Sequence, residues 1–362
     1  MERSRPPDRP TPRDRAIRLA IPLLLVVALI GVAIGVVRRS SHEASVPAPA
    51  ACLAGDRTSV VTPRGSFSTG YLREPTDATT FDASETSWRP DLSTYPINLD
   101  GEAARLCWLD GEVYGSIPES MTWEDAHDLN QPCIRIVATE WMVVEGLRCD
   151  NTDDGLRPRE VGTGANDVAM LIKGTYLTRI RDDCLENDGI IGGLLQDNLW
   201  DGCNTGISER PSDAQGSFDQ PAGETLVLDR MLIGLAITPH EDGPGENALF
   251  KWSDSANDLV IRCSIFKVDA ISLNGPEAME IPGRIDDRRC PDRPTTLVWL
   301  GGGTYPGRLP SGITVTSDIA VWDAAVTEWK CDHGYPATGC RHPSSTDTTT
   351  ATPTPADATA HG

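Results

Sequence analysis

The chain is poor in positive charge, and in lysine above all. Its 362 residues include 32 Lys and Arg against 53 Asp and Glu, which gives a formal net charge of −21, and only four of the basic residues are lysines. Nucleic-acid affinity depends on clustered positive charge that contacts phosphates, so this composition excludes a nucleic-acid partner. At 39% hydrophobic residues, the chain is nevertheless too apolar to be disordered throughout, and it is long enough for one large domain or two ordinary ones.

The sequence also lacks the short motifs of several common sites. It has no CxxC pair and no histidines at metal-ligand spacing, which argues against structural zinc. The glycines at 301–303 follow a strand-like run but lack the lysine and helix of a phosphate-binding loop. No Ser-His-Asp set can be assigned. No helical period of ordinary length separates the strand-like segments, so a βαβ fold is not expected.

The positive charge that is present gathers at the N-terminus. Residues 1–39 carry eight arginines against three acidic residues, a net charge of +5, which leaves −26 on the rest of the chain. Within this arm, residues 19–37 form an uncharged run of 19 residues, about the length that crosses ~30 Å of hydrocarbon as a helix. Six arginines precede the run and two follow it, so the positive-inside bias places residues 1–18 in the cytoplasm and the main domain outside.

We therefore expect an uncleaved, single-pass anchor in the cell membrane at residues 19–37. The alternative is a cleaved signal peptide, but its apolar core usually has ~7–15 residues and is followed by small residues, whereas Arg38 and Arg39 close this run. Gly31 and Gly35 form a GxxxG pair, a pattern that can bring two membrane helices together. Homodimerisation through this pair is a further hypothesis, and two small residues in an Ala/Val-rich span is the alternative.

All ten cysteines lie beyond this anchor, from Cys52 to Cys340. An even number on the outer side predicts structural disulfides formed in an oxidising compartment. Cys331 and Cys340 bracket a Gly/Pro loop and are one candidate pair. Cys184 and Cys203 are another, because they occupy the same position in two successive repeats described below; a buried pair of free thiols is the alternative.

Composition divides the chain into an anchored arm, a folded region and a tail. Residues 38–51 have the composition of a flexible linker. Residues 342–362 are rich in Thr, Pro and Ala and contain no large apolar residue, which predicts a disordered tail. The folded, extracytoplasmic domain is therefore expected at residues 52–341.

Three segments of this domain align as short repeats. They begin at Gly146, Gly174 and Gly193, which are 28 and 19 residues apart, and weaker copies extend over about residues 95–310. Each unit combines strand-like pieces with a turn signal such as Asp-Gly. A short repeat of strand and turn predicts a coil whose turns stack at the ~4.8 Å spacing of paired strands. Each repeat also places an aspartate eight residues after its glycine, at Asp154, Asp182 and Asp201.

These repeats resemble the right-handed parallel β-helix of the pectin-lyase-like superfamily. The resemblance rests on the aligned Asp-Gly, Asp-Asp-Cys and Asp-Gly-Cys positions, with Asn-Thr-Asp at 151–153 just before the first. It implies an all-β solenoid; a β-sandwich or several small β modules is the alternative. Near the C-terminus, residues 321–330 place two tryptophans on one helical face. We expect this short helix to cap the open end of the stack and protect its last strand edge.

The same resemblance points to a candidate catalytic site. Asn-Thr-Asp at 151–153 and Asp-Asp at 182–183 resemble the carboxylate motifs of polygalacturonases, glycoside hydrolases on this fold whose aspartates serve as general acid and as activators of water. The match is incomplete, because residues 200–203 read Trp-Asp-Gly-Cys where that family has Gly-His-Gly, and the family's Arg-Ile-Lys is missing. The candidate catalytic residues are Asp153, Asp182 and Asp183.

Charged residues around the aligned aspartates are candidate ligand-binding residues. Stacked carboxylates repel one another unless a cation such as Ca²⁺ bridges them, some stay protonated, or each bonds to turn amides. A ladder of turn-capping aspartates is therefore the alternative to a ligand site. Asp183 aligns with glycines of the neighbouring repeats, so a positive φ at that position would strain it. The candidate ligand-binding residues are Asp154, Asp201, Arg179, Arg181, Glu186 and Lys173.

Other residue types give weaker signals. The histidines of the domain (His127, His240 and His333) are scattered, and we expect surface or loop positions for them. Five aromatic residues are candidate sugar-stacking platforms, with core packing as the alternative. They are Trp123, Trp141, Trp200, Trp252 and Tyr305.

The sequence thus predicts a membrane-anchored, extracytoplasmic β-helix protein. We expect a non-catalytic surface module that interacts with a polysaccharide or cell-wall glycan. One alternative is a glycoside hydrolase or polysaccharide lyase that acts on glycans containing uronic acids, and another is a structural protein of the cell envelope. No cofactor is required by these hypotheses, except Ca²⁺ if the stacked carboxylates bind it.

Overall fold

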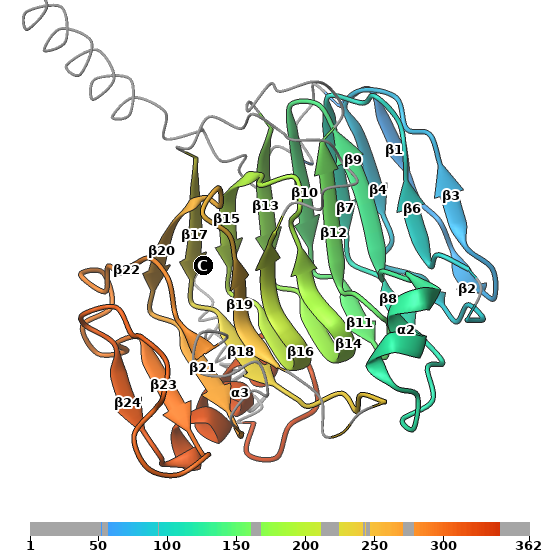
Figure 1. The fold of residues 1–362 in the computed structure, drawn as a ribbon. Coiled ribbons are helices and arrows are strands. Elements are labelled where there is room, and N and C mark those ends of the chain that lie inside the picture. The colour runs from blue at the N-terminus through green and yellow to red at the C-terminus, as the bar shows by residue number, and fades with distance from the viewer. Residues whose placement is uncertain are drawn as a thin grey trace, which may run out of the picture.

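The protein is built almost entirely of short parallel strands (Figure 1). In the part of the chain that this computed structural model describes, α2 (Trp123–Leu129) and α3 (Ile319–Asp332) are the only α-helices. The fold is therefore all-β with long parallel sheets, as the repeats predict. The described residues are 52, 57–92, 94–160, 168–210, 224–241, 243, 247–270 and 279–340.

Several expectations fall on other parts of the chain. The arm at 1–18, the anchor at 19–37 with its GxxxG pair, the linker at 38–51 and the tail at 342–362 lie outside the described residues. Among the helices that are described, none is both long and apolar enough to cross a membrane.

Within the described residues, the first sheet contains nine strands. Neighbouring strands pair in parallel and in register, so that Val143 lies between Cys107 and Leu171 of the adjacent strands. In order across the sheet, the strands are β1 (Ser59–Val61), β4 (Thr79–Asp82), β7 (Arg105–Leu109), β10 (Trp141–Glu145), β13 (Ala169–Lys173), β15 (Gly192–Gln196), β17 (Thr225–Asp229), β20 (Asp258–Arg262) and β22 (Arg284–Ile285).

The second sheet contains fifteen strands, ten along its main path and five in a branch. The main path is β2 (Gly65–Phe67), β5 (Thr86–Trp88), β8 (Glu112–Tyr114), β11 (Arg148–Asp150), β14 (Tyr176–Glu186), β16 (Leu199–Glu209), β18 (Leu232–Leu235), β21 (Ile265–Val268), β23 (Thr296–Trp299) and β24 (Thr314–Thr316). The branch adds β3 (Tyr71–Arg73), β6 (Ile97–Leu99), β9 (Ile134–Ala138), β12 (Leu156–Glu160) and β19 (Ala248–Trp252).

The chain passes from a first-sheet strand to a second-sheet strand once in each coil, as in β10 to β11 and β13 to β14. Parallel pairing starts with β1 and β2, before the expected beginning near residue 95. These early strands have only three residues each, too few for their side-chain pattern to stand out in the sequence. The stacked, parallel connectivity is compatible with a parallel β-helix.

The strands β14 and β16 connect the main path to the branch. Each has 11 residues, and each shows a register shift, between Ile180 and Asp183 in β14 and between Asp201 and Cys203 in β16. Beyond the shift, their second halves pair with branch strands β12 and β19. Because of these register shifts, the residues of β14 after Arg181 belong to the branch of the second sheet.

In six successive coils, the chain changes direction directly after its first-sheet strand, at a residue with a left-handed backbone conformation. Glycine occupies this corner at Gly146 and Gly174, but the next coil has Asp197 there, while Gly193 lies inside β15 opposite Met170. The third repeat therefore starts four residues later than the glycine alignment implies. Glycine marked the corner imperfectly because other residues also adopt this conformation. The six corner residues are Asp110, Gly146, Gly174, Asp197, Arg230 and Cys263.

The aspartate alignment changes accordingly. Strand pairing puts Asp201 beside Thr178, so the expected column of Asp154, Asp182 and Asp201 does not form. The backbone of Asp183 is not left-handed, so the strain expected from its alignment with two glycines is absent at this residue. The positions that do align in a left-handed conformation are Asn151 (φ 63°), Arg179 (φ 54°) and Gly202 (φ 102°).

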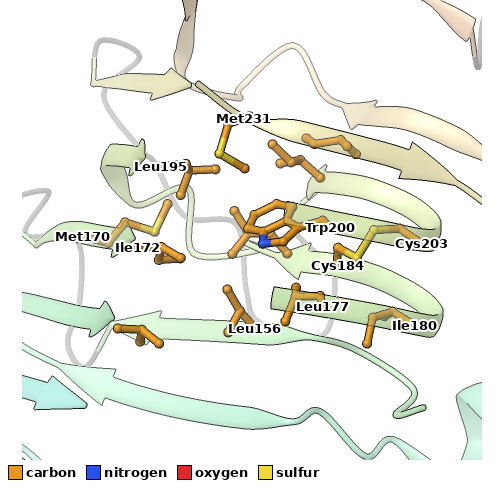
Figure 2. Packing of buried hydrophobic residues seen from close by; sticks show 14 of the residues in the cluster. Leu156, Met170, Ile172, Leu177, Ile180, Cys184, Leu195, Trp200, Cys203 and Met231 are labelled. Atoms are coloured by element: carbon orange, nitrogen blue, oxygen red, sulfur yellow. A yellow bond between two sulfur atoms is a disulfide. The ribbon is translucent and has the colours of Figure 1, made fainter. Parts of the chain in front are cut away.

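The interior of the stack is apolar. Trp200 is fully buried among methionine and leucine side chains, and the disulfide between Cys184 and Cys203 lies beside it (Figure 2). Its indole N–H donates to Thr175 Oγ1 at 2.9 Å, which satisfies the polar group. Both predicted cysteine pairs are disulfides. The five bonds are Cys52–Cys107, Cys133–Cys149, Cys184–Cys203, Cys263–Cys290 and Cys331–Cys340.

The C-terminal helix α3 contains the predicted segment 321–330, but it does not cap the end of the stack. It packs along the outer face of the second sheet, where Trp322, Ala325 and Trp329 are buried. The expectation of a cap was wrong because one column of outward side chains is apolar over four coils and, together with a valine of the next coil, attracts the apolar face of the helix. That column consists of Tyr176, Leu199, Leu232 and Ile265, and Val298 of the next coil lies two residues beyond Thr296, which continues the column.

Candidate functional site

A hollow of about 1290 Å³ opens on the outer side of the branch, over β12, β14, β16 and β19. Strand alternation explains its lining, because one column of residues enters the core while the next column faces outward. The inward column is Leu156, Leu185, Ile207 and Phe250, and the outward column is Arg157, Glu186, Ser208 and Lys251.

One wall of the hollow is α2, which stands beside β14 (Figure 1). Thr122 caps the helix by accepting a hydrogen bond from the backbone N–H of Asp125 at 3.3 Å. The side chain of Ala126 is fully buried. This packing aims the next residue, His127, at the carboxylates of β14.

The carboxylates of Asp182 and Asp183 converge on one lysine. Lys251 Nζ lies 2.9 Å from Asp182 Oδ1 and 2.8 Å from Asp183 Oδ1. The other oxygen of Asp182, Oδ2, lies 3.1 Å from His127 Nδ1. The four groups form a compact network at the bottom of the hollow, which we call the Asp182–Asp183 site.

The network gives the two carboxyl groups different pKa values. Burial disfavours the charge of Asp182, but the hydrogen bond from His127 and the charge of Lys251 outweigh it and hold the pKa of Asp182 below its usual range. Burial and the charge of Asp182 raise the pKa of Asp183 to about 7. Two neighbouring carboxyl groups whose pKa values are pushed apart are suited to act as an acid and a base.

Two more aspartates lie buried behind this site. Asp154 forms an ion pair with Arg157, and burial raises its pKa well above the usual value. Asp153 is 1% exposed, and neither of its carboxyl oxygens has a hydrogen-bond partner. Burial, followed by the charges of Asp154 and Asp182, raises the pKa of Asp153 to about 10, so this group holds its proton at neutral pH.

One group of carboxylates has the spacing for a cation. Asp154, Asp182 and Asp183 each offer an oxygen, and the three oxygens lie within 4.8 Å of one another. Ca²⁺ prefers such ligands, so these residues are where the expected Ca²⁺ would bind. The ammonium group of Lys251 already contacts two of the three carboxyl groups, and a cation would have to displace it.

A second set of ion pairs extends along the hollow. Arg159 lies 3.0 Å from Glu186 and 3.4 Å from Asp188, and Arg157 also contacts Glu186. Burial raises the pKa of Glu186 to about 7 despite the charge of Arg157. The hollow is therefore lined by charges of both signs that already pair with one another.

The candidate aromatic residues differ in access. The ring of Trp123 already stacks against His127 at 4.7 Å and against His240 at 5.1 Å between ring centroids. Trp252 lines the hollow and packs edge-on against Phe250, which leaves it as the sugar-stacking candidate. Trp200 and Tyr305 are core residues, and Arg57 lies over the ring of Trp141.

The structure thus brings part of the predicted site together. Asp182, Asp183 and Glu186 line the hollow, whereas Asp153 and Asp154 lie buried behind it. The other candidate residues occupy the corners or outer faces of the coils and have partners there. These are Lys173 with Glu145 at 3.2 Å, Arg179 with Asp150 at 2.8 Å, Arg181 with Asn151 at 3.5 Å, and Asp201 with Lys267 at 3.7 Å.

The sequence did not single out His127 or Lys251. His127 and His240 do occupy surface or loop positions, as expected, but each lies against a carboxylate there. The pattern Thr122-x-x-Asp125 is a helix-start signal and would have located α2. Lys251, one of only four lysines, stands inside an apolar strand-like run, which is a second usable signal.

Comparison with models of known protein families, with curated proteins and with solved structures finds no significant match.

Proposed function

We propose that this chain is a glycoside hydrolase with the right-handed parallel β-helix architecture of the pectin-lyase-like superfamily. Its substrate would be a polysaccharide that contains uronic acids. The observation that carries the proposal is the Asp182–Asp183 site, in which two carboxyl groups share Lys251 in an open hollow while their pKa values are displaced in opposite directions.

The two carboxyl groups have distinct roles in this proposal. Glycoside hydrolysis uses one protonated carboxyl group, which donates a proton to the leaving oxygen, and one ionised carboxylate. Asp183, with a pKa of about 7, is the general acid, because it is protonated at neutral or weakly acidic pH and can still release its proton. Asp182 is the ionised partner, which accepts a proton from water or stabilises positive charge on the sugar ring.

The charge of the site favours an anionic sugar. The hydrogen bond to Asp182 raises the pKa of His127, so this ring carries charge in weakly acidic solution. Lys251 and protonated His127 then offer two positive charges against the single negative charge of Asp182, while Asp183 holds its proton. Trp252 and Arg210 also line the hollow and are available to stack on a sugar ring and to pair with a uronate.

The resemblance to polygalacturonases lends further support. The Gly-His-Gly and Arg-Ile-Lys motifs of that family are absent from the sequence, yet the hollow contains a histidine and a lysine beside the Asp-Asp pair. His127 comes from α2, and Lys251 comes from β19, where Leu249 and Phe250 precede it. Five disulfides in the domain agree with an extracytoplasmic location, and we propose that residues 19–37 anchor it to the membrane.

The purified full-length protein should be incubated with polygalacturonate, other uronans and neutral glycans, and both reducing ends and unsaturated ends should be measured. Asp183→Asn is expected to lower kcat/KM by about 10²- to 10⁴-fold, the usual contribution of a general acid. Asp201→Asn is the matched control, because it removes an aspartate charge outside the hollow. Unsaturated ends would identify a lyase instead, and an active Asp183→Asn variant would refute the assignment of the acid.

A non-catalytic glycan-binding module is the second candidate. It is favoured by the ion pairs that already engage Asp182, Asp183 and Glu186, because paired carboxylates suit a stable binding surface. Calorimetry with the same glycans distinguishes the two functions. Binding without any product would support the module, and absence of both binding and product would count against both candidates.

A further inference from the structure

The Asp182–Asp183 site includes a histidine from outside the strands of the branch. His127 Nδ1 lies 3.1 Å from Asp182 Oδ2, and the imidazole remains half-exposed while the carboxylate is buried. We propose that His127 is a positioning residue that keeps Asp182 ionised and correctly oriented, and that a wall formed by α2 and residues 238–241 holds the imidazole in place. The kinetic consequences of this inference rest on the proposed hydrolase function, whereas the contact itself does not.

The wall joins two segments that are far apart in the sequence. The backbone N–H of Trp123 donates to the carbonyl of Pro239 at 2.7 Å. Glu124 accepts from the backbone N–H of Glu241 at 3.2 Å and lies 2.9 Å from His240 Nδ1. The indole of Trp123 thereby stacks on the imidazoles of both His127 and His240. His127 thus has a fixed ring plane rather than the freedom of an exposed side chain.

Residues 238–241 are themselves tied to the strands that carry the site. Thr238 Oγ1 donates to the carbonyl of Arg181 at 3.0 Å, directly before Asp182. The backbone N–H of Thr238 donates to Asn204 Oδ1 at 3.3 Å. The wall is therefore built on β14 and β16, so the distance between His127 and Asp182 is set by the same elements that carry the carboxylate.

The two oxygens of Asp182 have different partners, and this gives His127 its importance. Lys251 holds Oδ1 and is shared with Asp183, whereas His127 holds Oδ2, and the indole N–H of Trp123 makes a smaller contribution to the lowered pKa of Asp182. Without His127, Asp182 keeps the shared lysine and the smaller contribution of the Trp123 indole, and burial then raises its pKa toward that of Asp183. The difference in pKa between Asp182 and Asp183 therefore becomes smaller, and the two groups differ less in protonation.

Several other charges face the imidazole. Asp182 and Asp154 favour its protonated form, and Lys251 opposes it. Glu124 and His240 lie across the indole of Trp123. The pKa of His127 is raised by its bond to Asp182, so the charged contact is complete in weakly acidic solution and is lost as the pH rises through this raised value.

The kinetic test compares two replacements of His127 in the full-length chain. His127→Ala is expected to lower kcat about 100-fold, the scale of a small misplacement of catalytic groups. His127→Gln restores an uncharged donor to Asp182 and should recover about tenfold of this loss, with the acidic limb of the pH profile moved to higher pH. His333→Gln is the control, since His333 bonds to the Trp329 carbonyl on α3. Equal activity of all three variants would overturn the inference.

The contact can also be measured without any substrate. The six histidines can be labelled with ¹⁵N, and the imidazole titrations followed by NMR. His127 is expected to titrate about 1–3 pH units lower in Asp182→Asn than in the wild type. An unchanged titration would overturn the inference even in an active enzyme. A changed titration in a protein that cleaves no glycan would leave the contact standing and refute the hydrolase function.

Discussion

Replacing Asp153 by asparagine should stabilise the protein increasingly as the pH rises. Asp153 is buried, neither of its oxygens has a hydrogen-bond partner, and its neighbours Asp154 and Asp182 are also carboxyl groups. Such a group stays protonated in the folded protein, with a pKa of about 10, whereas the unfolded chain releases the proton near its ordinary value of about 3.9. An asparagine has similar shape and nothing to titrate.

The size of the effect follows from proton linkage. Between these two pKa values the folded state binds one proton more than the unfolded state, so each pH unit lowers the free energy of unfolding by about 1.4 kcal/mol. The wild type therefore loses about 3 kcal/mol from pH 5 to pH 7 through Asp153 alone. Asp153→Asn removes this dependence, and any cost of burying the amide N–H groups is the same at every pH.

Urea unfolding, followed by tryptophan fluorescence with the disulfides intact, measures the free energy of unfolding at pH 5, 6 and 7. The difference between Asp153→Asn and the wild type should increase by about 3 kcal/mol over this range. Asp201→Asn is the control, because its carboxylate is partly exposed and paired with Lys267. If the wild type and Asp153→Asn lose stability in parallel, Asp153 is not protonated in the folded state and the reasoning fails.

Three further predictions concern the site, a disulfide and α3. Above pH 7, kcat/KM should fall about tenfold per pH unit as Asp183 loses its proton, and a pH–rate profile that stays flat to pH 9 would contradict its role as the acid. Replacing both Cys184 and Cys203 by alanine should lower the free energy of unfolding by about 3 kcal/mol, because their bond closes a 19-residue loop; calorimetry showing an unchanged Tm would argue against this bond. Trp329→Ala should cost about 3–5 kcal/mol in urea unfolding, and a loss below about 1 kcal/mol would show that α3 does not pack as described.

The sequence was informative where the stacking itself imposes a pattern. Gly146 and Gly174 were correctly aligned because both turn the chain at the same corner of successive coils. Asp182 and Asp183 were singled out as an adjacent pair, and they do line the hollow. These features are local or recur from coil to coil, so they are visible without knowledge of the strand register.

The features that the sequence did not predict depend on contacts between coils, and the coils vary in length. Successive corner residues are 23, 28, 33 or 36 residues apart, so counting along the sequence cannot place Lys251 beside Asp182. His127 reaches the site because α2 is inserted between β8 and β9, and a seven-residue helix has too few turns for a clear period. The position of α3 was missed because its partners are single residues from five different strands.

The packing of α3 also has a consequence for the order in which the protein folds. Most coils of such a stack contact only their neighbours, so they can form one after another while the chain is being synthesised. The strip covered by α3, from β14 to β23, gains its last contacts only when residues 319–332 have left the ribosome. This late segment thereby fixes coils that were made more than a hundred residues earlier, and a chain that stops before Ile319 leaves this whole strip uncovered.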